Sequence, residues 1–431
     1  MTNSFLPQSQ SDDEGVADYK VGGYHLVRKN DIYNQRYQVV SKLGWGHFST
    51  VWLCIDLESK RNVALKIVRA AKSYTETAED EIKLLMASTG SPAVATLLDH
   101  FVHTGPHGNH VCMVFEVLGS NLLDLIKHYR YRGIPLTLVK SIMKQVLVGL
   151  DYLHTRCSII HTDLKPENVL LRGTVDMGAE NFTWGQQYGL YKCRHKSSKL
   201  TTTVVSSSAS SSISSSSSID QHHNNNNEME LDNIIYNNGH SFYQHNNSER
   251  GEELSREHYP ACAIVDLGNA CWIDRHFTDD IQTRQYRSPE AIVRSRWSTP
   301  VDIWSAACMA FELATGDHLF KPKSSKTFDK SDDHLALMIE LLGPFPSPIT
   351  TQGSKSKQYF THRGELRNIS KLSEQWPLYN VLTEKYKFTH RESKDFEDFL
   401  LPMLQYLPEK RATARECLNH SFLKDVPPLV Q

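Results

Sequence analysis

The sequence predicts an α+β protein of two lobes, a small lobe made mostly of strands with one important helix and a larger lobe made mostly of helices. Short segments rich in β-branched residues dominate up to about residue 119, and long stretches of helical periodicity dominate after it. A run of serines and asparagines then interrupts the second lobe. With 431 residues and 39% hydrophobic content, the chain can bury a sizeable core.

Charge and cysteine content argue against several classes of protein. Lys and Arg number 47 and Asp and Glu 49, a net charge of -2, so no strong field favours nucleic acid or a membrane surface. The N-terminus has no signal-peptide pattern, and no run approaches the ~20 apolar residues that span a bilayer. The eight cysteines show no metal-ligand spacing and are expected to be reduced. We expect a cytoplasmic and nuclear protein, a monomer, with no direct binding to nucleic acid or membrane.

The first lobe is assigned to residues 20–119. Strand-like segments at 37–43, 49–57 and 62–68 are separated by the turn-forming sequences GWGH and ESKRN, which predicts an antiparallel meander. A helix is expected at about 75–87, where apolar residues recur at helical spacing, and a strand at 110–118 completes the lobe.

The second lobe is assigned to residues 120–171 and 261–431, with long core helices expected at 136–154 and 299–315. Residues 172–260 contain serine and asparagine runs that cannot form a packed core, so a disordered insert within the domain is predicted. Its two ends must then lie at neighbouring points on the surface. Residues 1–19 are predicted to be a polar, acidic, disordered tail.

A glycine-rich segment, LGWGHFSTV at residues 43–51, lies between two predicted strands. Glycine lets a backbone approach phosphate oxygens without a Cβ in the way. Ser49 stands where the third glycine of a GxGxxG motif would fall, so an ordinary hairpin is an equal alternative on this evidence. The residues of interest for nucleotide binding are Leu43, Gly44, Gly46 and Val51.

Lys66 lies inside an apolar strand, where an ammonium group is unfavourable unless an anion is near. A lysine that extends its side chain to water is the alternative. Glu81 on the following helix is the expected partner and would hold Lys66 over nucleotide phosphates. Glu79 and Asp80 are rival partners, but Glu81 directly precedes the apolar part of the helix.

The sequence HTDLKPEN at residues 161–168 is the strongest single motif. It resembles the catalytic loop of the eukaryotic protein kinases, with Thr162 where most of them have arginine. In chemical terms, Asp163 can accept a substrate hydroxyl proton, Lys165 can neutralise the transferring phosphoryl group, and Asn168 can supply an oxygen to Mg²⁺.

Further motifs of that resemblance follow in the expected order. The sequence AIVDLG is similar to the kinase DFG element with leucine for phenylalanine, which makes Asp266 the expected principal Mg²⁺ ligand. Glu290, in RSPE, is expected to form a structural ion pair with Arg411, and Asp302 is expected to brace the catalytic loop.

The resemblance covers nearly the whole chain outside the tail and the insert, and it implies the bilobal protein kinase fold with ATP and Mg²⁺ as cofactors. It also implies an adenine site behind Phe115. Side chains of Val51, Ala64 and Leu170 would enclose the base, and backbone groups of Glu116, Val117 and Leu118 would bind its edge.

Several sequences, among them HTDLKPEN, DLGNACW, TRQYRSPE and DDHLALMIELLGPFP, resemble the SR-protein kinase family. That family phosphorylates serines in the arginine-serine repeats of splicing factors and often carries an insert between the catalytic loop and DLG. The nearest alternative is the LAMMER group of dual-specificity kinases, whose signature EHLAMMERILG differs here in its first acid and its basic residue.

Two further expectations concern how such a kinase would work. Thr162 removes an arginine that would bind a phosphorylated activation segment, so activity should not require that phosphorylation. Gln282, Arg284 and Gln285 are expected to help hold the segment in place. Asp333 and Glu340 lie seven residues apart on one face of a predicted helix. The resemblance implies that, with Asp317 and Lys385, they line a docking groove for arginine-rich substrates.

The expected function is therefore ATP-dependent phosphorylation of serines in arginine-serine repeats by a constitutively competent kinase. The alternatives are a pseudokinase scaffold that binds basic repeats without transferring phosphate, and a proline-directed or dual-specificity kinase of the same broad group.

Overall fold

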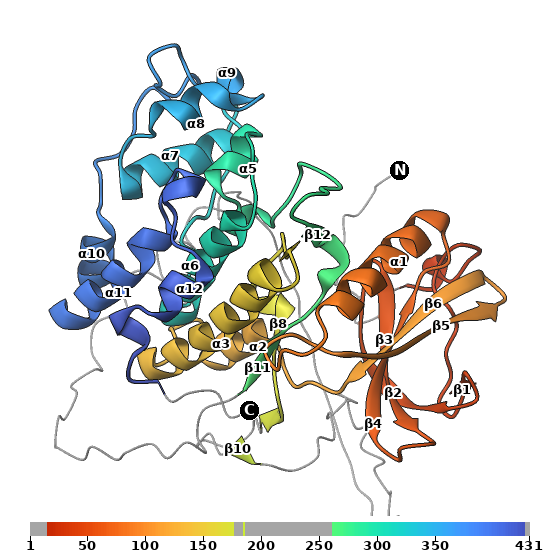
Figure 1. Ribbon diagram of the computed structural model, residues 1–431. Helices are drawn as coiled ribbons and strands as arrows, with labels where there is room; N and C mark the ends of the chain where they lie inside the picture. The colour runs from red at the N-terminus through yellow and green to blue at the C-terminus, as the bar shows by residue number, and fades with distance from the viewer. Residues whose placement is uncertain (1–14, 176–183, 186–260, 427–431) are drawn as a thin grey trace, which may run out of the picture. The chain divides into compact units, whose positions relative to one another are not determined.

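The computed structural model describes residues 15–175, 184–185 and 261–426. In this part of the chain a lobe of strands with one helix precedes a mainly helical lobe, as predicted (Figure 1). The predicted tail overlaps the described residues at 15–19, where Val16–Asp18 forms a 3-10 turn, η1. Asp18 pairs with Arg69 there, so the prediction placed the end of the tail too late. Residues 1–14 lie outside the described residues.

The first lobe contains a six-stranded antiparallel sheet in the order β1-β2-β3-β4-β6-β5. Its strands are β1 (Ile32–Tyr33), β2 (Tyr37–Gly46), β3 (Ser49–Asp56), β4 (Asn62–Val68), β5 (Leu97–Gly105) and β6 (Gly108–Glu116). The central strand β4 is buried on both faces, which explains its nearly continuous apolar sequence. Strand β5 was not predicted, because it is an edge strand whose half-buried and exposed residues alternate and include many polar side chains.

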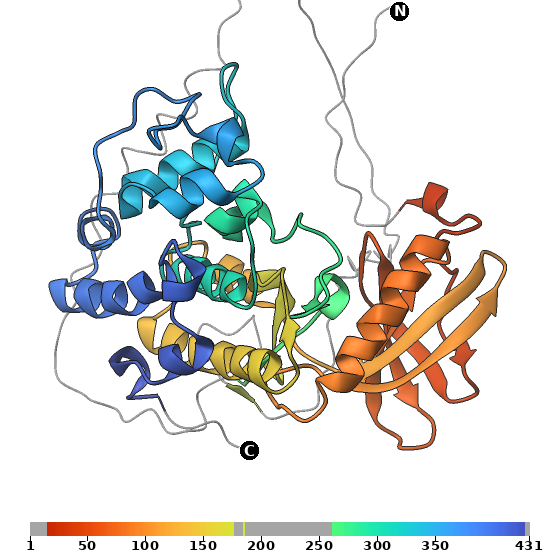
Figure 2. The same ribbon diagram turned by 45° about the horizontal axis from the view of Figure 1, so that its top comes forward.

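Helix α1 (Lys72–Ala87) packs against one face of this sheet (Figures 1 and 2). Its buried positions, which include Ala78, Ile82 and Leu85, recur at helical spacing. The helix begins three residues before its predicted start, and the Ala71 N–H that precedes it donates to Gly22 O at 2.9 Å. On the other face, Val27 from the segment before β1 packs in a cluster with Tyr33 of β1 and with buried residues of β2, β3, β4 and β6.

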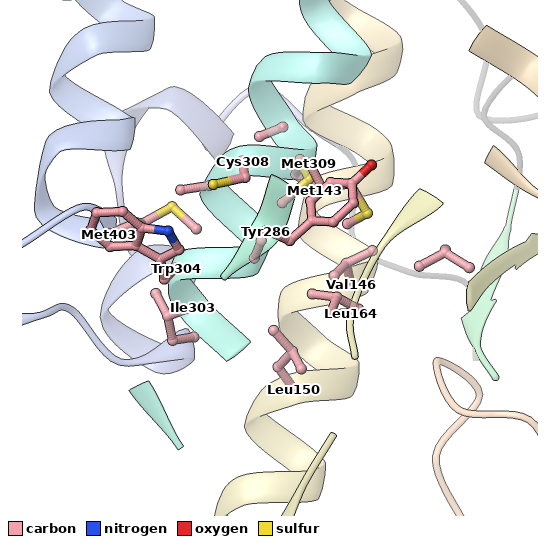
Figure 3. Packing of buried hydrophobic residues seen from close by; sticks show 14 of the residues in the cluster. Met143, Val146, Leu150, Leu164, Tyr286, Ile303, Trp304, Cys308, Met309 and Met403 are labelled. Atoms are coloured by element: carbon pink, nitrogen blue, oxygen red, sulfur yellow. The ribbon is translucent and has the colours of Figure 1, made fainter. Parts of the chain in front are cut away.

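The second lobe has its core at helices α3 (Leu136–Thr155) and α6 (Pro300–Thr315), both within one residue of their predicted bounds. Every residue of α6 after Pro300 is buried. Figure 3 shows this core, in which Met143, Val146 and Leu150 of α3 belong to the same cluster as Trp304 of α6.

The other helices of the described part surround this core. They are α2 (Leu122–His128), α5 (Pro289–Val293), α7 (Lys330–Leu342), α8 (Ser347–Gln352), α9 (Ser356–Tyr359), α10 (Leu378–Asn380), α11 (His390–Met403) and α12 (Ala414–Leu418). Single turns are η2 (Pro166–Asn168), η4 (Leu267–Asn269), η5 (Arg284–Tyr286), the π-turn η6 (Val381–Lys385), η7 (Pro408–Lys410) and η8 (Ser421–Leu423). Among the described residues, none of the helices combines the length and the apolar character that a membrane-spanning helix requires.

Four short strands frame the residues predicted to carry chemistry. They are β7 (Ile159–Ile160), β8 (Val169–Leu171), β11 (Cys262–Ile264) and β12 (Cys271–Trp272), and they pair as β7 with β12 and β8 with β11. The second pair joins the two ends of the predicted insert, since Leu171 opposes Cys262 and Arg172 N donates to Ala261 O at 2.6 Å. The predicted closeness of these ends is therefore confirmed.

Part of the predicted insert is also described. Strand β9 (Thr174–Val175) pairs antiparallel with β10 (Trp184–Gly185), so a short backbone pairing lies inside the range predicted as disordered. Residues 172–173, at the start of the insert, are described as well. Residues 176–183 and 186–260 lie outside the described residues.

Candidate active site

Lys66 of β4 and Glu81 of α1 form the predicted pair. Lys66 Nζ lies 2.7 and 2.9 Å from the two carboxylate oxygens of Glu81, and 3.6 Å from Asp266 Oδ1. Burial alone would lower the pKa of Lys66, but the two carboxylates raise it, so the ammonium stays charged. The two alternative partners of Lys66 do not contact it, since Glu79 is exposed and Asp80 pairs with Lys83.

Residues 161–168 follow β7 and are braced from α6 by the buried Asp302. Its carboxylate accepts from the backbone N–H of His161 and of Thr162, each at 2.8 Å, as predicted. It also lies 2.8 Å from His154 Nε2. Burial alone would raise the pKa of Asp302, but His154 and His161 lower it below its usual value, so the brace is ionised.

The His161 ring links this segment to the residue before Asp266. Its Nδ1 accepts from Asp163 N at 3.2 Å, which leaves Nε2 to donate to Val265 O at 3.0 Å. Val265 N in turn donates to Asn168 O at 3.0 Å. These bonds hold Asn168 and Asp266 beside each other although about a hundred residues separate them.

Asp163 has three hydrogen-bond donors around its carboxylate. Oδ1 accepts from Thr283 N at 3.1 Å and Thr283 Oγ1 at 2.6 Å, and Oδ2 accepts from Lys165 Nζ at 2.8 Å. Lys165 also donates to Thr283 Oγ1 at 3.0 Å. The sequence analysis missed Thr283, whose only signal was a hydroxyl in the motif TRQYRSPE.

Asp266 lies just beyond the end of β11 at Ile264 and adopts a left-handed backbone conformation with φ 63°. Burial alone would raise the pKa of Asp266, but the charge of Lys66 and the backbone N–H of Gly268 lower it, so it is ionised. A Cβ on Gly268 would lie 3.2 Å from Asp266 Oδ1 and 3.5 Å from Glu81 Oε2. Glycine therefore leaves room for the two carboxylates around Lys66.

The glycine-rich segment forms the hairpin between β2 and β3. Neither Gly44 nor Gly46 has a positive φ, and a Cβ on either would meet nothing within 4 Å. The protein's own packing therefore gives no reason for glycine at these two positions, whereas a ligand that lies against the hairpin would. Register places Val51 opposite Gly44 on β2 and opposite Lys66 on β4.

Residues 116–120 connect the two lobes. Gly119 N donates to Leu171 O at 2.6 Å, and Asn121 forms a bridge with Leu170, which places β8 beside this connection. Leu118 and Leu170 belong to one small apolar cluster. Ala64 lies opposite Phe115 in the sheet. Of the predicted adenine residues, Val51 and Ala64 thus lie on the neighbouring strands β3 and β4, and Leu170 lies beside the connection between the lobes.

Arg172, at the root of the insert, is a second residue that the sequence analysis did not single out for a site. Its guanidinium pairs with the carboxylate of Glu116 and donates to Pro92 O at 2.8 and 3.1 Å. The contacts tie the start of the insert to the connection between the lobes.

Gln282 is the centre of the segment that follows Asp266. The two N–H groups of its buried side chain donate to Val301 O and Ser305 Oγ, each at 2.8 Å, and the same nitrogen lies 3.2 Å from Tyr286 O. Its Oε1 accepts from Ser288 N at 2.9 Å. Its backbone N–H donates to Thr162 O at 2.9 Å. Packing and hydrogen bonds thus order the segment.

The two other side chains expected to hold this segment differ from each other. Arg284 donates to Ser331 Oγ at 3.1 Å. Gln285 is half-buried and makes no hydrogen bond to another described residue. Further along, the predicted buried pair of Glu290 and Arg411 is present, with both side chains fully buried and the shortest contact 2.6 Å.

Of the four predicted docking residues, the structure brings two into contact. Lys385 Nζ lies 3.1 Å from Asp317 Oδ2, which also accepts from Tyr386 OH at 2.8 Å. Asp333 and Glu340 both lie on α7, where Asp333 accepts from Lys323 N and Glu340 accepts from Ser373 N. No contact among the described residues joins these two acids to Asp317 or Lys385.

Comparisons with known proteins agree with this geometry. The family model of the protein kinase domain matches residues 37–208 and 248–423. The probable serine/threonine-protein kinase sky1 of Dictyostelium discoideum is 50% identical over 99% of this chain and 84% of its own length. Serine/threonine-protein kinase SRPK of Physarum polycephalum is 51% identical over 97% of this chain and 93% of its own length. Human SRSF protein kinase 3 is 40% identical over 98% of this chain and 92% of its own length.

Proposed function

The chain belongs to the SR-protein kinase family of serine/threonine protein kinases, and from that membership we propose that it phosphorylates serines in the arginine-serine repeats of SR-type splicing factors. The observation that carries the proposal is the carboxylate of Asp163, held by Lys165 and Thr283 beside Asn168. Similarity to proteins named SRPK and SRSF protein kinase supports the class of substrate.

Asp163 acts as the base in the proposed reaction. It accepts the hydroxyl proton of the substrate serine as the serine oxygen bonds to the γ-phosphorus of ATP and the bond from that phosphorus to the bridging oxygen breaks, with ADP as the second product. Thr283 fixes the carboxylate through Oδ1. Lys165 donates hydrogen bonds to the side chains of Asp163 and Thr283. Its positive charge offsets the repulsion between the Asp163 carboxylate and the negatively charged phosphoryl group.

Kinase domains use ATP with a divalent metal ion, and the residues here fit Mg²⁺. Asn168 Nδ2 donates to Asp163 O at 2.9 Å, which leaves the amide oxygen as a ligand, and Asp266 is an ionised carboxylate. Among the described residues no three His, Cys, Asp or Glu side chains gather into a metal site. Two protein oxygens suit Mg²⁺, which proteins usually bind through one or two side chains together with substrate phosphates, so Asn168 and Asp266 would hold the ion and it would offset phosphate charge.

Lys66 would bind the α- and β-phosphates while Glu81 keeps it in place. Leu43, Gly44, Gly46 and Val51 would lie over the nucleotide, and the open space beside the two glycines supports this role. Ala64 and Leu170 would contact adenine, whose edge would bind backbone groups of Glu116 and Leu118.

Activity without phosphorylation of the segment after Asp266 is the next part of the proposal. The ordering of that segment by Gln282, and its bond to the backbone of Thr162, support it. Protein treated with a phosphatase that is then removed should keep its full rate on an arginine-serine peptide. A large loss that returns on rephosphorylation would overturn constitutive activity while leaving the kinase assignment intact.

The three acids among the docking residues, Asp317, Asp333 and Glu340, would bind substrate arginines away from Asp163, and Lys385 would line the same groove through its contact with Asp317. Asp317 is half-exposed. Its partial burial alone would raise its pKa, but hydrogen bonds from Tyr386 and Lys385 lower the pKa below its usual value, so the carboxylate is ionised. Asp333 Oδ1 and Glu340 Oε2 accept no hydrogen bond from a described residue, so both can accept guanidinium N–H groups. Repeats held there would raise the local substrate concentration.

A triple variant, Asp317→Asn with Asp333→Asn and Glu340→Gln, tests this docking. The KM of a long arginine-serine substrate should rise while kcat and the KM of a short peptide stay near wild type. Asp124→Asn, which removes a surface acid of α2 paired with Lys127, is the matched control. Equal KM values for triple variant and wild type would refute the docking role.

Incorporation of phosphate into an arginine-serine peptide with Mg²⁺ and ATP tests the main proposal, with Asp163→Ala as the blank. A rate no higher than the blank would favour the scaffold alternative. Ser-Pro and tyrosine peptides run beside it separate the remaining alternatives, because a proline-directed kinase prefers the first and a LAMMER-type kinase also accepts the second.

We also propose that the protein is a monomer of the cytoplasm and nucleus that binds neither nucleic acid nor membranes directly. The near-neutral charge balance supports this part. Light scattering of the full chain and microscopy of a fluorescent fusion test it.

A further inference from the structure

The tip of the glycine-rich hairpin is held from outside the hairpin. Tyr24 OH donates to Gly46 O at 2.7 Å, Arg69 Nη1 donates to His47 O at 3.3 Å, and Arg69 N donates to Phe48 O at 3.0 Å. Three successive carbonyls are therefore bonded, although these tip residues are exposed and Phe48 is 52% exposed. Apart from edge-to-face contacts of His47 and Phe48 with the ring of Tyr74, this exposed tip depends on such bonds for its position.

Arg69 connects this tip to the segment before the sheet. It is buried, its Nη2 lies 3.1 Å from Asp18 Oδ1, and its guanidinium lies 4.6 Å from the ring centre of Tyr24 and 5.3 Å from that of Tyr74. Tyr74 OH is 3.1 Å from His47 Nε2 on the hairpin. The cation is thus fixed by one carboxylate and two aromatic faces.

Residues 18–24, which we call the strap, are anchored by their backbone. Ala71 N donates to Gly22 O at 2.9 Å, Ala70 N to Gly23 O at 3.1 Å, and Gly22 N to His107 O at 2.8 Å. Gly22 has φ +78°, and a Cβ on Gly23 would lie 2.0 Å from Asp18 O, so the strap needs both glycines. Ala71 directly precedes α1, so one strap contacts both the hairpin and the start of the helix that carries Glu81.

We propose that the strap positions the glycine-rich hairpin for ATP, with Tyr24 and Arg69 as positioning residues. The proposal rests on the proposed function, in which the hairpin covers the phosphates. A hairpin already fixed at Gly46 to Phe48 loses less conformational freedom when nucleotide binds, so the strap increases ATP affinity without touching ATP. It does not alter the peptide site, which is built from the second lobe.

Tyr24→Phe tests the strap, because it removes the bond to Gly46 O and keeps the ring beside Arg69. The KM for ATP of the full-length protein should rise about two- to tenfold, the range of one ordinary hydrogen bond, with the KM for peptide unchanged. Amide exchange should become faster in residues 43–51. Tyr37→Phe is the matched control, since it removes a bond of 2.7 Å to Asp99 in the same lobe but none to the hairpin tip.

The proposal is supported only if both changes occur in Tyr24→Phe and neither occurs in Tyr37→Phe. An unchanged KM for ATP, unchanged exchange in residues 43–51, or equal changes in both variants would overturn it. Wild type run in parallel separates this result from the proposed function. A wild type inactive on the peptide refutes the kinase function, whereas an active wild type with an unaltered Tyr24→Phe variant refutes the strap alone.

Discussion

Replacing Gln282 with methionine would remove the centre of the ordered segment after Asp266 while keeping its volume. Methionine fills a similar space but neither donates nor accepts the hydrogen bonds that the amide makes. The buried amide of Ser288 then loses its acceptor at 2.9 Å, and the Ser288 hydroxyl loses one at 3.1 Å. Tyr286 O is less affected, because Ser305 Oγ still donates to it at 2.9 Å.

The loss of stability follows from these groups. One buried N–H without an acceptor costs about 1–3 kcal/mol, and the loss of the remaining bonds adds about 1 kcal/mol. We therefore expect a decrease of about 2–4 kcal/mol in the free energy of unfolding, which leaves the protein folded. The same segment contacts the catalytic loop, since Gln282 N donates to Thr162 O and Thr283 Oγ1 donates to Asp163. In the variant the segment must be ordered again before each reaction. If that ordering costs about 1.4 kcal/mol, kcat/KM falls about tenfold.

Urea unfolding and steady-state kinetics on an arginine-serine peptide measure the two effects. Gln285→Met is the matched control, since Gln285 is half-buried and makes no hydrogen bond to another described residue, and both of its values should stay near wild type. A Gln282→Met protein with wild-type stability, or with kcat/KM within twofold of wild type, would show that the amide does not order the segment.

Three further predictions concern other contacts. Arg411→Leu leaves the Glu290 carboxylate buried without its partner and should lower the free energy of unfolding in urea by about 3–5 kcal/mol; a loss below about 1 kcal/mol would contradict the pair. Burial and neighbouring histidines lower the pKa of His25 to about 4, so its neutral ring stabilises the fold above pH 6.5 and this stability is lost as the pH falls from 6.5 through 4. The melting temperature of His25→Phe should therefore fall less over that range than that of wild type, and an equal fall would refute the assignment. Arg172→Gln removes the ion pair that holds Glu116, whose backbone would bind adenine, and should raise the KM for ATP about two- to tenfold. The double variant Arg172→Glu with Glu116→Arg should bring the KM for ATP back toward the wild-type value, and a KM that stays as high as in Arg172→Gln would contradict the role of the pair.

Local sequence patterns were sufficient for the two core helices, for the central strands of the sheet and for most residues of the candidate site. Strands and helices impose periods of two and 3.6 residues, so α3 and α6 were placed within one residue. Lys66 stood out because an ammonium in an apolar strand needs an anion, and Glu81 was the acid at the right place on the next helix. The burial of strand β5 alternates, but its sequence, LLDHFVHTG, does not alternate between apolar and polar residues, because no position of this edge strand is fully buried.

Residue type and local spacing were enough to predict a lobe of strands followed by a lobe of helices, and to single out the acids and lysines expected to carry the chemistry. The kinase fold itself followed from the resemblance of the motifs, in their order, to those of protein kinases. The distant groups that hold these residues became visible only in the folded chain. Thr283 meets Asp163 across 120 residues, Arg172 meets Glu116 across 56, and Tyr24 reaches Gly46 from outside the hairpin. A hydroxyl or guanidinium gives no periodic signal of its partner, because that partner is chosen by how the chain packs.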